Sequence, residues 1–282
     1  MSKLNYSDKL FYKYRSIDEH TESLLINNEL FFNHPDNFND PFDCKLDFFH
    51  KGPLEMWIEF FSRRNVHPVA ARNLIKDKLK EREFKRKKDG ILYEGKNLID
   101  DGALLRACCF SERKDSLLMW GHYARNHEGI CISFKSFSVE EFFLLPLDSD
   151  YALPFFKVEY KDDKPPAINL LGVSTPEDTK SIIKDFYLTK FTDWEYEHEY
   201  RLLATINDRE GESVIKFQKD ALEGVTFGLN IKKDNALRIK TIIDQYYKGM
   251  GVKFYRTIKS DRKYAIEFEE IRDFDKYIKS IN

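Results

Sequence analysis

The sequence predicts an α+β fold with a mixed, largely antiparallel sheet, split or sandwiched, with peripheral helices and a helical insertion at about 53–95. Segments typical of strands outnumber those typical of helices, and the two kinds do not alternate regularly along the chain. No internal repeat or linker divides the sequence. Because 282 residues lie near the upper size of one hydrophobic core, we expect a single elaborated domain over residues 1–282.

The N-terminal part predicts two short strands, one helix and a turn-rich loop. The aromatic run LFYKYR at 10–15 indicates a strand, and the cap residues after it indicate a helix over about 18–26. A short apolar run at 30–32 leads into NHPDNFNDPFD at 33–43, whose Asn, Asp and Pro residues favour ordered turns. From 53 to about 88 the pattern is helical and increasingly charged, which we interpret as an insertion with a solvated far end.

The remaining elements follow from apolar runs, caps and breakers. Strands are expected at 106–111 and 129–134, with Ser116 capping a helix between them, and another strand at 155–160. Thr175 begins a helix that leads to a strand carrying Glu197 and Glu199. The C-terminal part predicts strands near 214–217, 225–229, 252–257 and 264–268, and a helix over 233–248.

Composition excludes several classes of protein. With 46 basic and 48 acidic residues the net charge is -2, so a nucleic-acid role would need a local patch. No apolar run approaches the roughly 20 residues that span a bilayer, and the N-terminus lacks the apolar core of a signal peptide. We therefore expect a cytoplasmic protein. The four cysteines show no Cys-x-x-Cys spacing and are expected to be buried apolar residues.

The segment FTDWEYEHEYRLL at 191–203 is the first candidate site. On a strand Glu197 and Glu199 would share one face, which Arg201 continues. Paired carboxylates can activate a sugar hydroxyl or stabilise an oxocarbenium ion. The alternative is a surface ion pair between Glu199 and Arg201 on an edge strand.

Other motifs carry two readings each. Arg15, next to Tyr14, could hold a phosphate bidentately or form a surface ion pair. Asp40 and Asp43 could bind a hard metal, although such acids more often cap turns. His122 is either a hydrogen-bonded core residue or a catalyst. The sequence contains no P-loop, dinucleotide-binding glycine pattern or His-Glu-x-x-His motif.

Six stretches in order resemble a widespread bacterial family of unknown function. They are YKYRS at 12–16, LFFNHPDNFNDPFD at 30–43, CFS at 109–111, MWGHYA at 119–124, GIC at 129–131 and WEYEHEYR at 194–201. The resemblance spans about residues 10–270. The order of motifs is also distantly similar to the ADP-ribosyltransferase fold, which has Arg or His on the first strand, Ser, Thr or Tyr on a middle strand and a late Glu.

The second resemblance implies a role for each matching residue. Arg15 would orient the pyrophosphate or ribose of NAD, and Ser111 would brace the nicotinamide ribose. Glu199 would bind the ribose 2'-hydroxyl and stabilise the oxocarbenium ion, while Glu197 would activate the acceptor. Two features depart from that pattern, because a Ser-Thr-Ser tripeptide is absent and the insertion at 53–95 is not a standard part.

Three functional hypotheses result. The leading one is an ADP-ribosyltransferase-like protein acting on NAD, as a bacterial toxin or anti-phage effector, with Glu199, Glu197 and His122 catalytic and Arg15, Ser111 and Tyr14 binding NAD. The acceptor and any regulatory partner protein are left open, and no metal is predicted for this activity. The second is a metal-dependent hydrolase or nuclease using Asp40, Asp43, His122 and Glu199. The third is a non-enzymatic binding module in which the motifs build structure.

Overall fold

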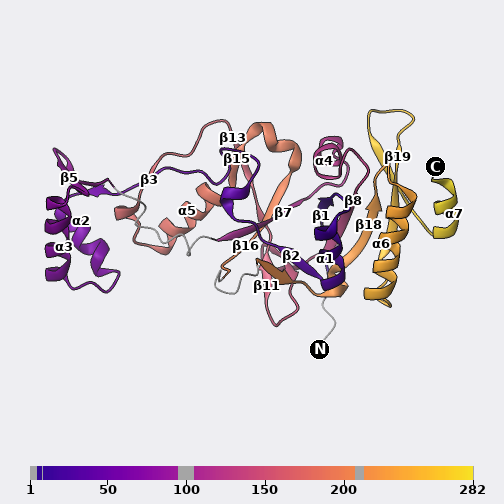
Figure 1. The fold of residues 1–282 in the computed structure, drawn as a ribbon, viewed down its shortest axis with the longest axis horizontal. Coiled ribbons are helices and arrows are strands. Elements are labelled where there is room, and N and C mark those ends of the chain that lie inside the picture. The colour runs from indigo at the N-terminus through magenta and orange to yellow at the C-terminus, as the bar shows by residue number, and fades with distance from the viewer. Residues whose placement is uncertain (1–4, 8, 95–104, 207–212, 282) are drawn as a thin grey trace. The chain divides into compact units, whose positions relative to one another are not determined.

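The structure is a computed structural model that describes residues 5–7, 9–94, 105–206 and 213–281 (Figure 1). The chain forms two compact units. Unit 1 comprises Met1–Asn37, Leu105–Tyr160 and Thr192–Asn282, and unit 2 comprises Phe38–Leu104 and Lys161–Phe191. Compactness does not test whether either unit folds alone, so the single-domain organisation stays a prediction.

Unit 1 is built on an eight-stranded sheet in the order β12-β16-β7-β1-β8-β18-β19-β20. Neighbouring strands are antiparallel except β18 and β19, which are parallel. The predicted α+β class with a mixed, largely antiparallel sheet is thus confirmed. The strands are β1 (Leu10–Arg15), β7 (Arg106–Ser111), β8 (Ile130–Lys135), β12 (Phe156–Lys157), β16 (Glu199–Ala204), β18 (Leu222–Phe227), β19 (Lys253–Lys259) and β20 (Ile266–Glu270).

Smaller elements complete unit 1. The hairpin strands β9, β10 and β11 form a three-stranded sheet that the sequence did not predict, and β2 pairs with β17. The helix α7 was also not predicted. The bounds are α1 (Glu19–Asn27), β2 (Glu29–Phe31), η1 (Pro35–Asn37), α4 (Leu117–Tyr123), β9 (Phe137–Val139), β10 (Phe142–Pro146), β11 (Ala152–Pro154), η4 (Thr192–Glu197), β17 (Val214–Lys216), η6 (Lys219–Ala221), α6 (Lys233–Tyr246) and α7 (Phe274–Ser280). The strand β13 (Glu159–Lys161) crosses the boundary between the units along the chain.

The two faces of the large sheet carry different side chains. Because strand side chains alternate, Phe11 and Tyr14 on β1 point to opposite faces. The face with Phe11 packs against α1, α6 and α7 and forms the main core. The face with Tyr14 packs against α4 through Met119 and Trp120. The main core includes Leu24, Leu25, Phe110, Phe134, Leu202, Val225, Phe227, Ile239, Ile243 and Ile278.

Unit 2 has a separate core and a second small sheet. Trp57 and Ile75 pack with Phe84 and Ile91. The strand order of the small sheet is β4-β6-β5, and β3 pairs in parallel with β14. The elements are β3 (Phe48–Phe49), β4 (Lys51–Gly52), α2 (Leu54–Ser62), α3 (Pro68–Lys80), β5 (Phe84–Lys87), β6 (Gly90–Tyr93), β14 (Ile168–Asn169), η3 (Leu170–Gly172), α5 (Pro176–Tyr187) and β15 (Thr189–Phe191).

The predicted helical insertion at 53–95 is only partly helical. Its first two thirds form α2 and α3, but the charged end forms the hairpin of β5 and β6, and residue 95 lies outside the described residues. Phe84 is buried with its ring centroid 4.5 Å from that of Trp57, while the lysines and arginines of β5 are exposed. The charge spacing of this segment is typical of a helix. Burial of Phe84 against Trp57 favours the strand instead. Within the described residues no helix is long and apolar enough to cross a membrane.

Candidate functional site

Ser111 and Glu199 lie directly opposite each other on adjacent strands of unit 1. The antiparallel register of β7 and β16 pairs their Cα positions, and β1 lies on the other side of β7 with Tyr12 opposite Ser111. Both Ser111 and Glu199 are buried, at 1% and 3% exposure. The register therefore brings together the middle-strand serine and the late glutamate that the sequence analysis selected.

Glu199 is held by a guanidinium two residues further along its own strand. Arg201 Nε donates to Glu199 Oε1 at 2.7 Å, and Arg201 Nη2 donates to Oε2 at 3.0 Å. Arg201 is fully buried, so the pair is a charge-assisted bidentate contact inside the protein. The predicted shared face of Glu199 and Arg201 is correct, but the alternative of a surface ion pair is wrong.

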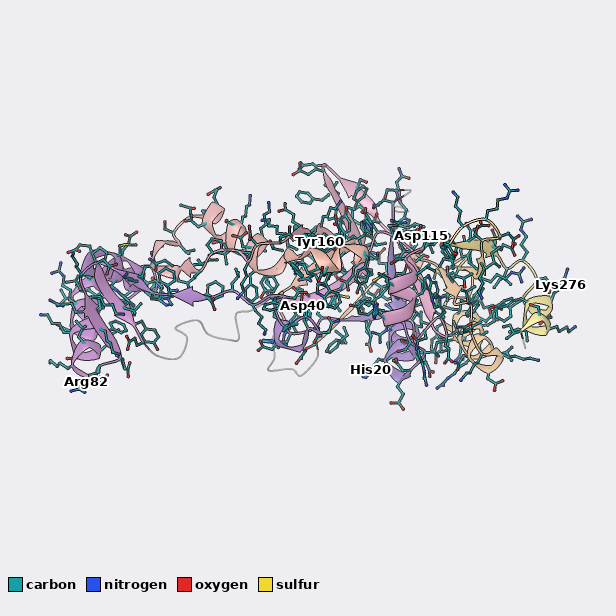
Figure 2. The ribbon with its side chains drawn as sticks, turned by 90° about the horizontal axis from the view of Figure 1, so that it is seen from above. His20, Asp40, Arg82, Asp115, Tyr160 and Lys276 are labelled. Atoms are coloured by element: carbon teal, nitrogen blue, oxygen red, sulfur yellow. The ribbon has the colours of Figure 1, made fainter. Side chains whose placement is uncertain are left out.

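Besides Arg201, the Tyr160 hydroxyl and the Cys109 thiol contact Glu199. The backbone N–H of Glu199 donates to the Tyr160 hydroxyl at 2.8 Å; Tyr160 is labelled in Figure 2. Cys109 lies opposite Arg201 on β7. Burial raises the pKa of the Cys109 thiol well above its usual range, and the negative charge of Glu199 adds to the shift. Cys109 is therefore a neutral neighbour of the ion pair at physiological pH.

Glu197 is not on the strand with Glu199, which corrects the sequence prediction. It is the last residue of the 3-10 helix η4, and His198 after it has a left-handed backbone with φ of 44°. This kink replaces the expected alternation of side chains. Even so, the Glu197 side chain is buried at 4% exposure, and its Oε1 accepts a hydrogen bond from the Tyr123 hydroxyl at 2.5 Å.

Ser111 connects the middle strand to the Glu197 segment. Its hydroxyl donates to the backbone carbonyl of Glu197 at 2.6 Å and accepts from the backbone N–H of Arg113 at 3.1 Å. The hydroxyl thus fixes where η4 ends beside β7. Ser111 thus links two buried acids, Glu199 through the strand register and Glu197 through its backbone carbonyl, and we call these three residues the two-acid cluster.

The helix α4 covers this face of the sheet. Ser116 caps it by accepting from the Met119 N–H at 3.4 Å, as predicted. Trp120 is fully buried and donates from Nε1 to the Lys114 carbonyl at 2.8 Å. Its ring lies edge-on to Tyr14, with centroids 5.3 Å apart. Tyr123, in the last turn of α4, reaches the two-acid cluster through its bond to Glu197.

Two of the remaining predicted site residues are His122 and Tyr14. His122 is exposed on α4, with its ring 5.9 Å from that of Tyr196 in η4. Tyr14 is buried and donates its hydroxyl to the Arg113 carbonyl at 2.9 Å, and burial strongly raises its pKa. Both lie beside the elements that build the two-acid cluster.

Arg15 has partners of its own at the end of β1. Its Nε donates to Thr21 Oγ1 at 3.0 Å, and its Nη2 lies 3.7 Å from Asp18 Oδ1. Among the described contacts none joins Arg15 to Glu197 or Glu199. These contacts match the alternative in which Arg15 forms an ion pair near the surface.

Sequence reasoning missed the hydroxyl contacts of Tyr123 and Tyr160. Tyr123 stands next to the selected His122, and the spacing on α4 gave no reason to prefer it. Tyr160 reaches Glu199 because β12 pairs with β16, which brings together segments about 40 residues apart. Only the sheet topology could have revealed that contact.

The FNDPFD loop of unit 2 contains the other predicted acids. Asp40 Oδ1 accepts from the Phe42 N–H at 2.8 Å, which is a turn-capping contact, and Asp40 Oδ2 is buried without a hydrogen-bond partner in the described part of the chain. Asp43 Oδ2 lies 3.7 Å from the ammonium of buried Lys190. No group of three or more His, Cys, Asp or Glu placed to hold a metal ion occurs among the described residues.

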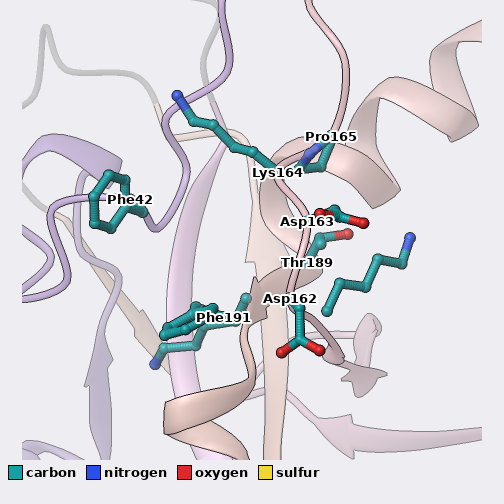
Figure 3. A pocket seen from close by; sticks show the side chains of 9 residues that line it. Phe42, Asp162, Asp163, Lys164, Pro165, Thr189 and Phe191 are labelled. Carbon is teal, nitrogen blue, oxygen red and sulfur yellow. The ribbon is translucent and has the colours of Figure 1, made fainter.

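A pocket of about 270 Å³ lies next to this loop, wholly within unit 2 (Figure 3). Phe42 and Phe191 line it and are 64% and 38% exposed. Three lysines and two aspartates also line it, so opposite charges largely compensate there. The lining residues are Phe42, Lys161, Asp162, Asp163, Lys164, Pro165, Thr189, Lys190 and Phe191.

The segment that carries α4, β8 and the two acids also matches a known family. Residues 119–202 match the family model described as Protein of unknown function (DUF2971). The predicted resemblance to a family of unknown function is confirmed for this part of the chain. The DUF2971 match includes His122, Glu197 and Glu199, whereas Arg15 and Ser111 lie outside it. The searches of curated proteins and of solved structures found no match.

Proposed function

We propose that this chain is an ADP-ribosyltransferase-like protein that uses NAD as a substrate. The observation that carries the proposal is the two-acid cluster, in which Ser111 lies opposite Glu199 and hydrogen-bonds the backbone of Glu197. The fold-level analogy to the transferases requires a middle-strand hydroxyl beside a late glutamate. The register of β7 and β16 supports that requirement.

Arg201 would orient Glu199 for this role. A carboxylate can accept about four hydrogen bonds, and Arg201 donates two of them, so the clamp by itself does not saturate the acid. The Glu199 carboxylate, whose charge Arg201 partly offsets, would stabilise the oxocarbenium ion that forms as nicotinamide leaves. Glu197, with its carboxylate held by Tyr123, would then remove the proton from the acceptor.

Access to the cluster is a requirement of the proposal. Ser111, Glu197 and Glu199 are all at least 96% buried, so NAD reaches them only if α4 or η4 shifts. The exposed and half-buried rings of His122, Tyr196 and Trp194 lie on these two elements, with the Trp194 and Tyr196 centroids 6.1 Å apart. We propose that they contact the nicotinamide ring during entry.

A thermal-shift titration with NAD tests the proposal. A ligand that binds only the native state increases the free energy of unfolding by mass action, by about 2.7 kcal/mol at 100 times its Kd, and so raises the melting temperature. We expect NAD to raise the melting temperature of the wild type and of His20→Ala, an exposed control, but not of Glu199→Gln. Absence of any NAD effect on the wild type would contradict the proposal.

The cellular role follows from the chemistry. Unrestrained consumption of NAD depletes a cofactor that every cell needs, so we propose a toxin or anti-phage effector. Induced expression should then slow bacterial growth, and Glu199→Gln should remove that effect. Equal growth inhibition by both proteins would argue against an NAD-dependent toxin.

A binding module is the second candidate function. It is favoured by the complete burial of Arg201 and by the use of Ser111 and Glu197 in backbone and hydroxyl contacts. On this reading the acids only hold β16 and η4 in place. Nicotinamide release separates the two functions, because a binding module releases none.

A further inference from the structure

The tip of the β19–β20 hairpin forms one wall of a second pocket, and this pocket lies entirely within unit 1. Its volume is about 570 Å³, within the range of small-molecule sites. Leu117 at the start of α4, Leu229 after β18 and His127 also line it. The hairpin contributes residues 259–266.

Three cations at this tip have no acidic partner. Lys259, Arg262 and Lys263 are exposed, and within the described residues no carboxylate lies within 4.0 Å of their charged groups. Nearer the base of the same hairpin, by contrast, Arg256 pairs with Glu269 at 2.6 Å. Asp261 lines the same pocket and offsets one of the three charges, so the tip keeps a local positive charge on a chain whose net charge is -2.

Apolar and aromatic groups are interleaved with these cations. Tyr264 follows Lys263 and is fully exposed, and Leu117, which also lines the pocket, is 41% exposed. Ile266 also lines the pocket and packs into the cluster of Trp120 and Tyr14. An exposed aromatic ring beside uncompensated cations is the combination that binds a base and its phosphate.

We propose that this pocket binds a nucleotide unit, with Lys259, Arg262 and Lys263 contacting phosphate and Tyr264 stacking on the base. The unit is either a free nucleotide or one residue of a single-stranded nucleic acid. An acidic peptide would use the cations but not the flat ring of Tyr264. The inference does not depend on the transferase proposal, because it uses none of the residues of the two-acid cluster.

Two binding measurements distinguish a free nucleotide from a single-stranded nucleic acid. One is fluorescence anisotropy of a labelled 12-nucleotide single-stranded DNA, and the other is calorimetric titration with AMP. The variants are Lys259→Gln/Arg262→Gln/Lys263→Gln and Tyr264→Ala. The controls remove the same charge at Lys233, Lys248 and Lys279, and a ring of similar exposure at Tyr151, which is 77% exposed. All substituted side chains are exposed, so the melting temperatures should stay unchanged.

We expect affinity for the oligonucleotide to fall with salt, and the triple variant to reduce the slope of log K against log salt by about 2, since each phosphate contact contributes about 0.7. Tyr264→Ala should weaken binding roughly tenfold, as expected for loss of one base stack. The control variants should behave like the wild type.

Binding of AMP without the oligonucleotide, weakened by the same variants, would assign the site to a free nucleotide. Two results would overturn the proposal. One is the absence of measurable binding to either probe. The other is an equal loss of affinity in the hairpin variants and in the controls, which would indicate only non-specific charge.

Discussion

Arg201 is completely buried and donates hydrogen bonds to both carboxylate oxygens of Glu199, its neighbour two positions earlier on β16. The pair lies on the face of the sheet opposite the main apolar core, in which Leu202 is packed. A buried ion pair need not add stability relative to apolar residues, but loss of one partner leaves an uncompensated buried charge. This relationship makes the pair a structural anchor and, on the proposed function, the device that orients the acid.

Substitution of Arg201 tests the anchor. Arg201→Met should lower the free energy of unfolding by about 3–5 kcal/mol, because Glu199 then remains buried without its partner. Denaturant unfolding measures the loss. The control is Arg256→Met, whose pair with Glu269 is 41% and 49% exposed and should contribute less than about 1 kcal/mol. Equal small losses in both variants would show that the Glu199 pair is not buried in solution.

Tyr123 and Tyr14 allow a matched comparison of two hydroxyl groups. Tyr123 donates to the carboxylate of Glu197, whereas Tyr14 donates to the neutral carbonyl of Arg113. A hydrogen bond to a charged group is worth about 1.5–3 kcal/mol and a neutral one about 1. Tyr123→Phe should therefore destabilise more than Tyr14→Phe in thermal or denaturant melts. The reverse order would contradict a stronger contribution from the bond between Tyr123 and Glu197.

Gly129 and Gly121 differ in the space around them. A Cβ at Gly129 would collide with the carbonyl oxygen of Arg15, while a Cβ at Gly121 on α4 has no atom within 4 Å. We expect Gly129→Ala to destabilise by at least about 2 kcal/mol through backbone displacement, in the range of overpacked sites. Gly121→Ala should stabilise by about 0.5–1 kcal/mol, since alanine favours a helix. Similar melting temperatures for the two variants would contradict the close approach of β8 and β1.

His50 in unit 2 predicts a pH-dependent stability. Desolvation, assisted by the charge of Arg64, lowers the pKa of His50 to about 4, from about 6.5 in the unfolded chain. Between pH 4 and pH 6.5 the unfolded state binds more protons at His50 than the folded state does. The stability that the neutral His50 side chain gives the folded protein is therefore complete above pH 6.5 and is lost as the pH falls toward 4. The loss is up to about 3 kcal/mol.

His50→Phe checks this prediction. The ring lies 6.0 Å from that of Trp57 and 5.3 Å from that of Phe60, so phenylalanine keeps the aromatic packing. The difference in unfolding free energy between wild type and variant, measured from pH 4 to pH 7, should vary with pH. A difference that stays constant over this range would mean that His50 titrates alike in the folded and unfolded chain.

Local patterns predicted the elements whose signals are self-contained. The aromatic run at 10–15 gave β1 with the observed bounds, and the run at 106–111 gave β7. Thr175 and Asp178 form the capping box that begins α5. The capping contacts of α5 join residues three positions apart, so no distant segment is needed to predict where that helix begins.

Other features depend on partners far along the chain. The period-two pattern placed Glu197 on a strand, but the left-handed His198 ends the 3-10 helix η4 before β16 begins. Its carbonyl accepts a hydrogen bond from the N–H of Glu112, a contact across more than 80 positions. The pairing of Glu199 with Arg201 was visible in the sequence, but its burial was not. The strands β7 and β12 flank β16, so the pair does not lie on an edge strand.

The most direct test of the proposed function is to measure nicotinamide release and acceptor labelling together, with purified protein, labelled NAD and cell extract. The wild type should do both. Glu197→Gln, which can still accept the Tyr123 hydrogen bond, should release nicotinamide but transfer little label, because acceptor activation is lost. Glu199→Gln leaves Arg201 buried without its carboxylate partner, so it is assayed at a temperature at which its unfolding curve shows it folded; it should then lose both activities. If the wild type releases no nicotinamide under conditions in which it is folded, the transferase account is wrong and the binding module takes its place.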